Sequence, residues 1–282
     1  MKNRFPFVLI AALTGGSLPF TRPADSVAFA QTPVSVPTVA APQTVSAPAA
    51  LRVAIYDHSK GDAKAPPALM RFLTKEAGFV CTRVRPEDIA SGCLKEYDVL
   101  IMPGGSGSLQ AQKLGETGRE NIRTWVKNGG GYVGICAGAY LATTYYPWSL
   151  NILNARVVDR EHWARGTGQV KVEFTPEGKT ALHAPEGEAE IYYGQGPLLA
   201  PDTKAEPAPF ETLARYKSEI AKKGAPSGVM VGTTAMARGT FGQGRVICFS
   251  PHAEVKDGPN YLTLAGVRWA GKQEALSTPR KE

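Results

Sequence analysis

The chain has 282 residues, 43% of them hydrophobic, which is enough to bury a substantial core in one large domain or two small ones. Its formal charge of +7 at pH 7 comes from lysines and arginines that are scattered rather than gathered into runs. That distribution is typical of a solvated surface and excludes a nucleic-acid-binding arm, so we expect no nucleic-acid partner.

Residues 1–30 are predicted to be a signal peptide that directs export. Lys2 and Arg4 precede an apolar run at residues 7–13, and residues 28–30 have the A-x-A form of a cleavage site. The apolar run is too short to span a bilayer, which argues against an uncleaved anchor. Cleavage after Ala30 removes three basic residues and one acidic residue and lowers the formal charge from +7 to +5. We therefore expect a periplasmic or secreted protein with no stable membrane span.

Residues 31–50 are predicted to be a linker, because prolines are spread there among Ala, Val, Thr and Ser without charge or periodicity. The folded domain is predicted at residues 51–270, and the polar residues 271–282 form a tail.

The first half of the domain alternates predicted strands and helices. Strands are predicted at residues 51–56, 79–84, 97–102 and 132–135. One helix is predicted at residues 67–77 and ends at Gly78; a second is predicted at residues 118–127, where Thr117 and Glu120 have capping-box spacing. This alternation predicts an α/β fold with three αβα layers, in which helices cover both faces of a parallel sheet.

The second half is richer in strands. Strands are predicted at residues 169–174, 190–193, 210–216 and 228–236. Residues 241–245 have the pattern of a hairpin turn that leads into a further buried strand around Cys248. These short strands, joined by loops rich in Gly and Pro, predict an antiparallel extension of the parallel sheet.

The four cysteines are too few for a disulfide scaffold in a chain of this length. Cys81 and Cys93 are close in sequence and could form a disulfide in an oxidising compartment, or remain free thiols. Cys248 lies in a buried-strand pattern and is predicted to be a core residue.

Cys136 has a different setting, between Gly134 and Gly138 in the G-x-C-x-G form of a nucleophile elbow. So sharp a strand-to-helix turn strains the backbone of the nucleophile, and side chains at the flanking positions would collide with neighbouring backbone. The turn also places the sulfur at a helix N-terminus, which favours the reactive thiolate. Taken alone, the motif fits equally well a tight turn that happens to contain a cysteine.

A base for this cysteine is predicted at residues 250–254, directly after the strand of Cys248. His252 and Glu254 are two positions apart, so the imidazole can face the cysteine while the carboxylate binds its far nitrogen. The alternative is a surface histidine beside a glutamate. With Cys136, the pair predicts a catalytic triad.

A glycine turn, Gly104 and Gly105, follows the predicted strand that ends at Met102. The functional crevice of a parallel sheet lies at the carboxyl ends of its strands, so this turn should face the elbow. Its backbone N–H groups, with that of Ala137, are predicted to form an oxyanion hole.

In this order, the three segments resemble the class I glutamine amidotransferase superfamily, whose triad is Cys, His and Glu. The closer resemblance is to the N-terminal domain of biotin-protein ligases and its stand-alone bacterial relatives. It is carried by residues 102–105, 130–141, 192–196 and 242–246, the last leading into residues 250–254. The resemblance implies a flavodoxin-like, amidotransferase-like fold, with Cys136 as nucleophile, His252 as base and Glu254 as orienting acid. Ala253 departs from the usual H-P-E pattern, which is expected to loosen the loop.

Four residues are predicted to bind substrate. Tyr193 and Gln195 are inferred from the resemblance to form a pocket wall, while His162 and Arg165 belong to a loop whose aromatic and charged groups suit a polar ligand. The alternative for that loop is that Trp163 packs on the core. Asp57 and His58 are interpreted as a turn former and a solvated histidine rather than as crevice residues. No spacing of His, Cys, Asp and Glu predicts a metal site, and no cofactor is expected.

The leading functional hypothesis is a cysteine-dependent hydrolase or amide-transfer enzyme that acts on an amide or ester of a small molecule. Export argues against a glutaminase that supplies ammonia to a synthase. No biotin-ligase catalytic domain follows, so the chain is not expected to be a biotin ligase. Two alternatives remain: a non-catalytic extracytoplasmic module that binds or senses a small molecule, and a redox protein in which Cys136 reacts with oxidants.

Overall fold

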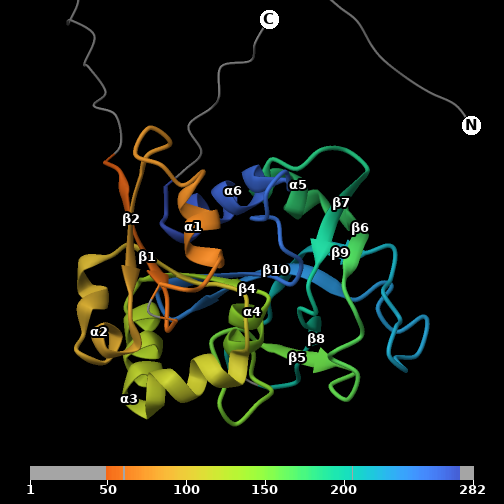
Figure 1. Ribbon diagram of the computed structural model, residues 1–282, viewed down its shortest axis with the longest axis horizontal. Coiled ribbons are helices and arrows are strands. Elements are labelled where there is room, and N and C mark those ends of the chain that lie inside the picture. Colours follow the sequence, from red (N-terminus) through yellow and green to blue (C-terminus); the bar gives the residue numbers. More distant parts are fainter. Residues whose placement is uncertain (1–48, 60, 205, 274–282) are drawn as a thin grey trace, which may run out of the picture. The chain divides into compact units, whose positions relative to one another are not determined.

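The computed structural model describes residues 49–59, 61–204 and 206–273. Within these residues, one mixed sheet of 11 strands lies between two layers of helices (Figure 1). The predicted signal peptide and most of the predicted linker and tail lie outside the described residues.

The first half of the sheet is parallel. Its strands lie in the order β2 (Phe79–Val84), β1 (Leu51–Tyr56), β3 (Val99–Met102), β4 (Gly131–Ile135) and β11 (Gly244–Phe249). All four pairings among them are parallel. Every residue of β3 and of β4 is buried, as expected for central strands that are covered on both faces.

The second half of the sheet is antiparallel and begins at β11. From there the order continues through β10 (Thr234–Phe241), β9 (Glu211–Tyr216), β6 (Gly168–Phe174) and β7 (Glu188–Tyr193). A short antiparallel pair, β5 (Ala155–Val158) and β8 (Leu198–Pro201), joins the sheet through β10. Since β11 pairs with strands of both halves, it is the junction between them.

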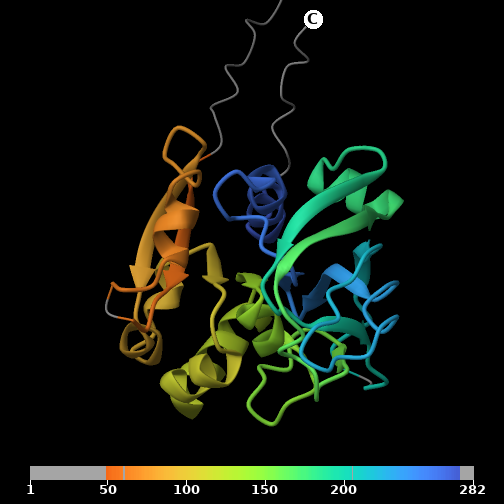
Figure 2. The same cartoon turned by 45° about the vertical axis from the view of Figure 1, so that its right-hand side comes forward.

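Helices cover both faces of the sheet (Figure 1). One face packs against α1 (Ala65–Met70), α5 (Pro176–Leu182) and α6 (Asn260–Ala270). The other packs against α2 (Pro86–Ala90), α3 (Gly107–Lys127) and α4 (Ala137–Ala142), with a short 3-10 helix at Cys93–Glu96. Figure 2 shows α6 in blue between the orange N-terminal part and the green strands β6 and β7. The predicted three-layer α/β fold with an antiparallel extension is therefore confirmed.

The helix predicted at residues 118–127 begins much earlier than expected. It belongs to α3, whose start is capped by Ser106, the hydroxyl of which accepts a hydrogen bond from the N–H of Leu109 at 3.3 Å. A non-helical glycine, Gly115, kinks the helix just before the predicted start. That kink interrupts the apolar periodicity, so only the second part of the helix was predicted.

Two other predictions extend too far. The helix predicted at residues 67–77 ends at Met70, and turns lead from there to Gly78. The strand predicted at residues 228–236 starts only at Thr234, because Gly228 and Gly232 both have φ near +82°, a left-handed conformation that a strand cannot contain.

Cys81 and Cys93 are free thiols, so the predicted alternative of a disulfide between them is wrong. Cys81 packs with the core on one face of the sheet and Cys93 with the core on the other, and the sheet lies between them. Cys248 is fully buried in β11, as predicted.

Candidate active site

The three predicted reacting segments lie at the carboxyl ends of three adjacent parallel strands. Gly104 follows β3, Cys136 follows β4 and His252 follows β11, and these strands are neighbours in the sheet. In parallel sheets this edge is where ligands bind.

Cys136 occupies a strained turn between β4 and α4, with φ of 50° and ψ of −98°. Neither Gly134 nor Gly138, two positions before and after it, has room for a side chain. A Cβ at Gly134 would lie 2.6 Å from the carbonyl oxygen of Gly138, and a Cβ at Gly138 would lie 2.0 Å from the carbonyl oxygen of Met102. Both glycines are thus required by close backbone contacts, and the segment has the geometry of a nucleophile elbow.

The sulfur of Cys136 lies where the two halves of the sheet meet. Its residue is only 4% exposed, and its N–H donates to the carbonyl oxygen of Phe249 at 2.8 Å. The thiol lies 3.5 Å from the carbonyl oxygen of Gly194, in the loop after β7. Backbone contacts from both halves therefore fix its position.

His252 and Glu254 form a hydrogen-bonded pair beside this sulfur. The imidazole Nδ1 lies 2.7 Å from Oε1 of Glu254. The His252 ring is held between two glycines: a Cβ at Gly104 would lie 2.7 Å from Cε1, and a Cβ at Gly194 would lie 2.6 Å from Nε2. The same Cβ at Gly104 would lie 3.7 Å from Cβ of Cys136, so the three residues are in close proximity.

The electrostatics of the pair favour a protonated imidazole. Burial lowers the pKa of His252, but its hydrogen bonds with Cys136 and Glu254 and the charges of those groups raise it further, to a final pKa of about 10. At neutral pH the group facing the sulfur is therefore an imidazolium.

Glu254 is buried and 3% exposed. Its second oxygen, Oε2, is also buried and has no hydrogen-bond partner among the described residues. Ala253 does not leave this loop loose, because the side-chain amide of Asn260 donates to the carbonyl oxygens of Ala253 at 2.6 Å and Val255 at 3.0 Å. The loop is thus anchored to the start of α6.

The predicted oxyanion-hole residues surround the same point. Gly105 has φ of +138°, which favours glycine, and Gly104 contacts both Cys136 and His252 as described above. Ala137 is the first residue of α4, and the first N–H groups of a helix have no partner within the helix. Gly104 and Ala137 thus lie next to Cys136, and the oxyanion-hole role of these backbone groups stays a prediction.

A cavity of about 310 Å³ opens beside Cys136. Its aromatic wall consists of Tyr140, Tyr146, Trp148 and Trp163, and we refer to it as the aromatic cavity. Ser106, Ser108 and Gln195 contribute polar groups, and Arg160 contributes a positive charge.

A second cavity, of about 580 Å³, lies on the other side of the imidazole. It includes His252 and Glu254 but not Cys136, and much of its wall is apolar, including Ala68, Leu109 and Val255. Gly105 and Ser106 line both cavities, so the two cavities adjoin along this turn.

The family model described as biotin-protein ligase, N terminal, matches residues 82–273, well over half of the chain. The chain belongs to this family. The resemblance inferred from four short segments is thereby confirmed. A sequence search of curated proteins gives no significant match.

Solved structures agree with this family's amidotransferase-like fold. A putative ThuA-like protein from Bacteroides uniformis is 18% identical, with a TM-score of 0.53, over 79% of this chain and 93% of that one. A cytoplasmic protein from Salmonella typhimurium is 14% identical, with a TM-score of 0.50, over 79% and 97%. A β-galactosidase from Rahnella sp. R3 is 15% identical, with a TM-score of 0.50, over 83% of this chain but only 33% of the enzyme. At these identities the likeness shows the fold alone.

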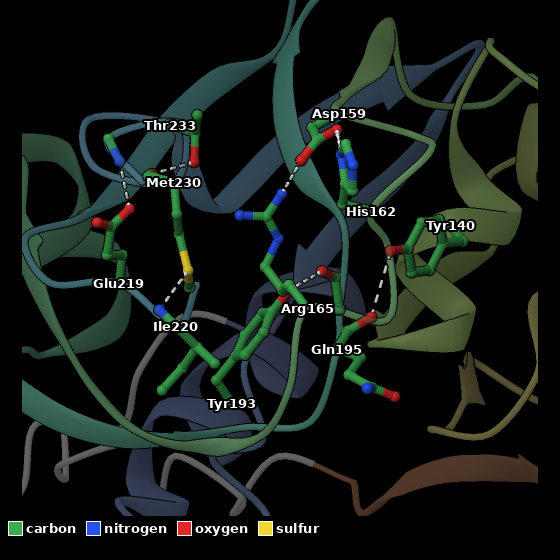
Figure 3. Close-up of polar contacts among 12 residues, drawn as sticks. Tyr140, Asp159, His162, Arg165, Tyr193, Gln195, Glu219, Ile220, Met230 and Thr233 are labelled. Atoms are coloured by element: carbon green, nitrogen blue, oxygen red, sulfur yellow. Dashed lines mark hydrogen bonds and ion pairs between the residues drawn. The ribbon is translucent and has the colours of Figure 1, made fainter. Parts of the chain in front are cut away.

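Two of the predicted substrate-binding residues contact another side chain of their own loop. His162 and Arg165 both bind Asp159, His162 through a contact of 2.6 Å and Arg165 through an ion pair (Figure 3). Arg165 is 1% exposed, and neither side chain lines the aromatic cavity. Their charges are paired within the loop, and their role in substrate binding stays a prediction. Trp163, between them, is 55% exposed and lines the cavity instead of packing on the core.

Tyr193 does not line the aromatic cavity, whereas Gln195 does. Tyr193 is 1% exposed, and its hydroxyl donates to the carbonyl oxygen of Gly196 at 2.9 Å. Side chains alternate across a strand, so the neighbouring Tyr192 points outward and lines the second cavity. The Gln195 carbonyl accepts from the hydroxyl of Tyr140 at 3.2 Å (Figure 3).

Sequence reasoning missed most of the aromatic wall. Its signal was the cluster of aromatic residues at positions 145–148, directly after α4. Asp57 is a buried turn former, as interpreted, and accepts from the N–H of Ser59 at 2.8 Å, whereas His58 lines the second cavity.

The described part of the chain contains no group of three or more His, Cys, Asp and Glu side chains placed to hold a metal ion. None of its helices combines the length and the apolar character that crossing a membrane requires.

Proposed function

We propose that this protein is a cysteine-dependent hydrolase that cleaves an amide or ester of a small molecule through Cys136, His252 and Glu254. The observation that carries the proposal is the 2.7 Å contact between His252 and Glu254, on a ring that lies next to Cys136 at the turn of Gly104. A nucleophile, a base and a group that orients the base are the parts of a generalised triad.

In the first step, the Cys136 thiolate attacks the carbonyl carbon and forms a tetrahedral adduct. The imidazolium of His252 favours the thiolate beforehand and then donates its proton to the departing nitrogen or oxygen. The carbon–heteroatom bond breaks, the amine or alcohol leaves, and a thioester remains on Cys136. Glu254 stabilises the positive charge of the ring throughout.

The negative oxygen of the adduct needs hydrogen-bond donors. We assign this role to backbone N–H groups of Gly104, Gly105 and Ala137, which are fixed by tight turns before the substrate arrives. Donors that are already in place are worth about 2.7–4 kcal/mol each in comparable sites.

In the second step, the now neutral His252 removes a proton from water, and the resulting hydroxide attacks the thioester. The carbon–sulfur bond breaks, the acid leaves, and the thiolate and imidazolium are restored. The second cavity adjoins His252 and offers water a route to the ring that does not pass the aromatic cavity.

Alkylation by iodoacetamide, followed by mass spectrometry, tests the proposal, because the other three cysteines are internal controls. Burial raises the pKa of Cys81 to about 11 and raises the pKa values of Cys93 and Cys248 as well. Cys136 should react first at neutral pH, and His252→Gln should slow it at least about 10-fold. His183→Gln, which changes the C-cap residue of α5, a position that lines neither cavity, should leave the rate unchanged.

The remaining outcomes separate the alternatives. A reactive Cys136 whose alkylation does not depend on His252 would favour a redox protein, and an unreactive Cys136 would favour a binding module. Hydrolysis of a panel of amides and esters by the wild type, but not by Cys136→Ser, would establish turnover.

We also propose that the protein is exported, with cleavage near Ala30. The support is the charged start, the apolar run and the A-x-A site of the sequence. N-terminal sequencing of the mature protein should give Gln31 as the first residue; an intact Met1 would contradict export by this signal.

A further inference from the structure

We infer that the aromatic cavity takes a small organic anion whose planar ring carries the scissile amide or ester. The inference rests on the proposed function, since it names the substrate class for the same site. The side chains that line the cavity carry the inference. Neither the family match nor the fold gives these side chains a role.

The wall presents flat apolar surfaces next to the sulfur. The rings of Tyr146 and Trp148 are stacked, with centroids 4.5 Å apart and planes inclined by 11°, so together they form one broad face. Trp163 contributes a second indole and is 55% exposed, although a large apolar side chain is usually buried. Aromatic faces of this kind bind planar rings by offset stacking.

The charge at the cavity has one sign. Arg160 is the only charged residue that lines it among the residues described, and no carboxylate does. Its guanidinium lies over the ring of Tyr145, 5.9 Å from the centroid, and the residue is exposed. A guanidinium on an aromatic platform suits a carboxylate, which it can bind with two hydrogen bonds.

This charge pattern argues against glutamine as the substrate. A free amino acid carries an ammonium group as well as a carboxylate, and the ammonium would find no carboxylate partner in the aromatic cavity. A buried, unpaired ammonium is costly. An anion without an ammonium group avoids this cost.

The loop that carries Arg160 and Trp163 is anchored from within. Asp159 binds both His162 and the buried Arg165, and these contacts fix the two ends of the segment (Figure 3). Because Arg165 and His162 already bind Asp159, that carboxylate does not compete for Arg160. Arg160 and Trp163 are therefore presented to the cavity by a preorganised loop.

The cavity volume of about 310 Å³ lies at the lower end of the range for small-molecule sites, about 300–1,000 Å³. It is suited to one ring with its substituents rather than to a peptide or a polymer.

Binding of ring compounds to the Cys136→Ser variant tests the inference without turnover. Calorimetry would compare 4-acetamidobenzoate with 4-acetamidobenzamide, which lacks the charge, and with 4-acetamidobenzylammonium, whose charge is opposite. N-acetylglycinate keeps the carboxylate without a ring. The benzoate should bind about 10-fold more tightly than the neutral amide and more tightly still than the cation. It should also bind about 3–10-fold more tightly than N-acetylglycinate.

Two variants test which residues cause these binding preferences. Arg160→Gln should remove the preference for the benzoate over the amide, whereas Arg156→Gln, an exposed arginine on β5 outside the cavity, should not. Trp163→Leu changes an exposed position where folding is not at risk. It should weaken the binding of every ring compound but not the binding of N-acetylglycinate.

Equal binding of the three ring compounds, or a preference that survives Arg160→Gln, would overturn the inference. That failure is distinct from failure of the proposed function, because the alkylation of Cys136 by iodoacetamide does not require a ring or a charge.

Discussion

The reacting residues and the aromatic wall beside them are held in place by different kinds of contact. Cys136 and His252 stand on turns where neighbouring glycines leave no room for a side chain. Tyr146, Trp148 and Trp163 belong to loops and are positioned by ring stacking and by side-chain contacts such as those of Asp159.

This difference separates chemistry from specificity. A backbone turn cannot change its shape without disturbing the sheet that carries it, so the reacting geometry depends on the fold itself. A loop side chain can be replaced while the fold remains intact. Under the proposed function, the fold keeps the reaction site while the adjoining wall selects the substrate.

The largest effect, a loss of stability, is expected from Gly138→Ala. The new Cβ would lie 2.0 Å from the carbonyl oxygen of Met102, so the elbow must move or the domain must open. We expect a loss of at least about 3 kcal/mol in the free energy of unfolding, measured with urea. Gly224→Ala is the control: Gly224 has positive φ, unlike Gly138, but no atom lies within 4 Å of its Cβ position, so without a clash the change should cost only about 1 kcal/mol.

Glu254→Gln should reduce turnover while leaving the loop of His252 in place. The amide has the shape of the carboxylate but no charge to stabilise the imidazolium, and it can orient the ring in the wrong tautomer. We expect turnover to fall by about 10²–10⁴-fold, with a normal circular dichroism spectrum. Glu173→Gln, on the exposed side of β6, should leave the rate unchanged. A Glu254→Gln variant of full activity would remove Glu254 from the reacting group.

The pH dependence of stability tests the electrostatics of the reacting residues. Since the pKa of His252 is raised from 6.5 to about 10 on folding, the folded protein holds this proton more tightly. The stabilisation is fully present below about pH 6.5 and is lost as the pH rises through about 10. The wild type should therefore exceed His252→Gln in free energy of unfolding at about pH 6, by an order of a few kcal/mol, and this difference should shrink by about pH 10.5. A constant difference would contradict the assigned charge state.

Trp163→Leu should have the smallest effect on the reacting residues. The indole is mostly exposed and lies on a loop, so its loss should leave the rate of Cys136 alkylation by iodoacetamide within about twofold. A large change would show that the wall and the reacting residues are coupled, against the separation described above.

The sequence indicated the residues of the proposed triad more fully than the residues of the aromatic wall. Short apolar runs followed by Gly104, Cys136 and His252 mark strand ends, and the topology of a parallel sheet then brings those ends together. The sequence does not show that Tyr193 is buried, because a pattern of two tyrosines does not say which of them faces inward. It also does not show the contacts of His162 and Arg165, because their partner, Asp159, lies outside the aromatic and charged segment of the loop.

The pH profile of Cys136 alkylation by iodoacetamide tests the central claim most directly. From about pH 6 to 8 the wild type should be alkylated at least about 10-fold faster than His252→Gln, because only the wild type has an imidazolium beside the sulfur. Identical profiles for the two proteins would contradict the account.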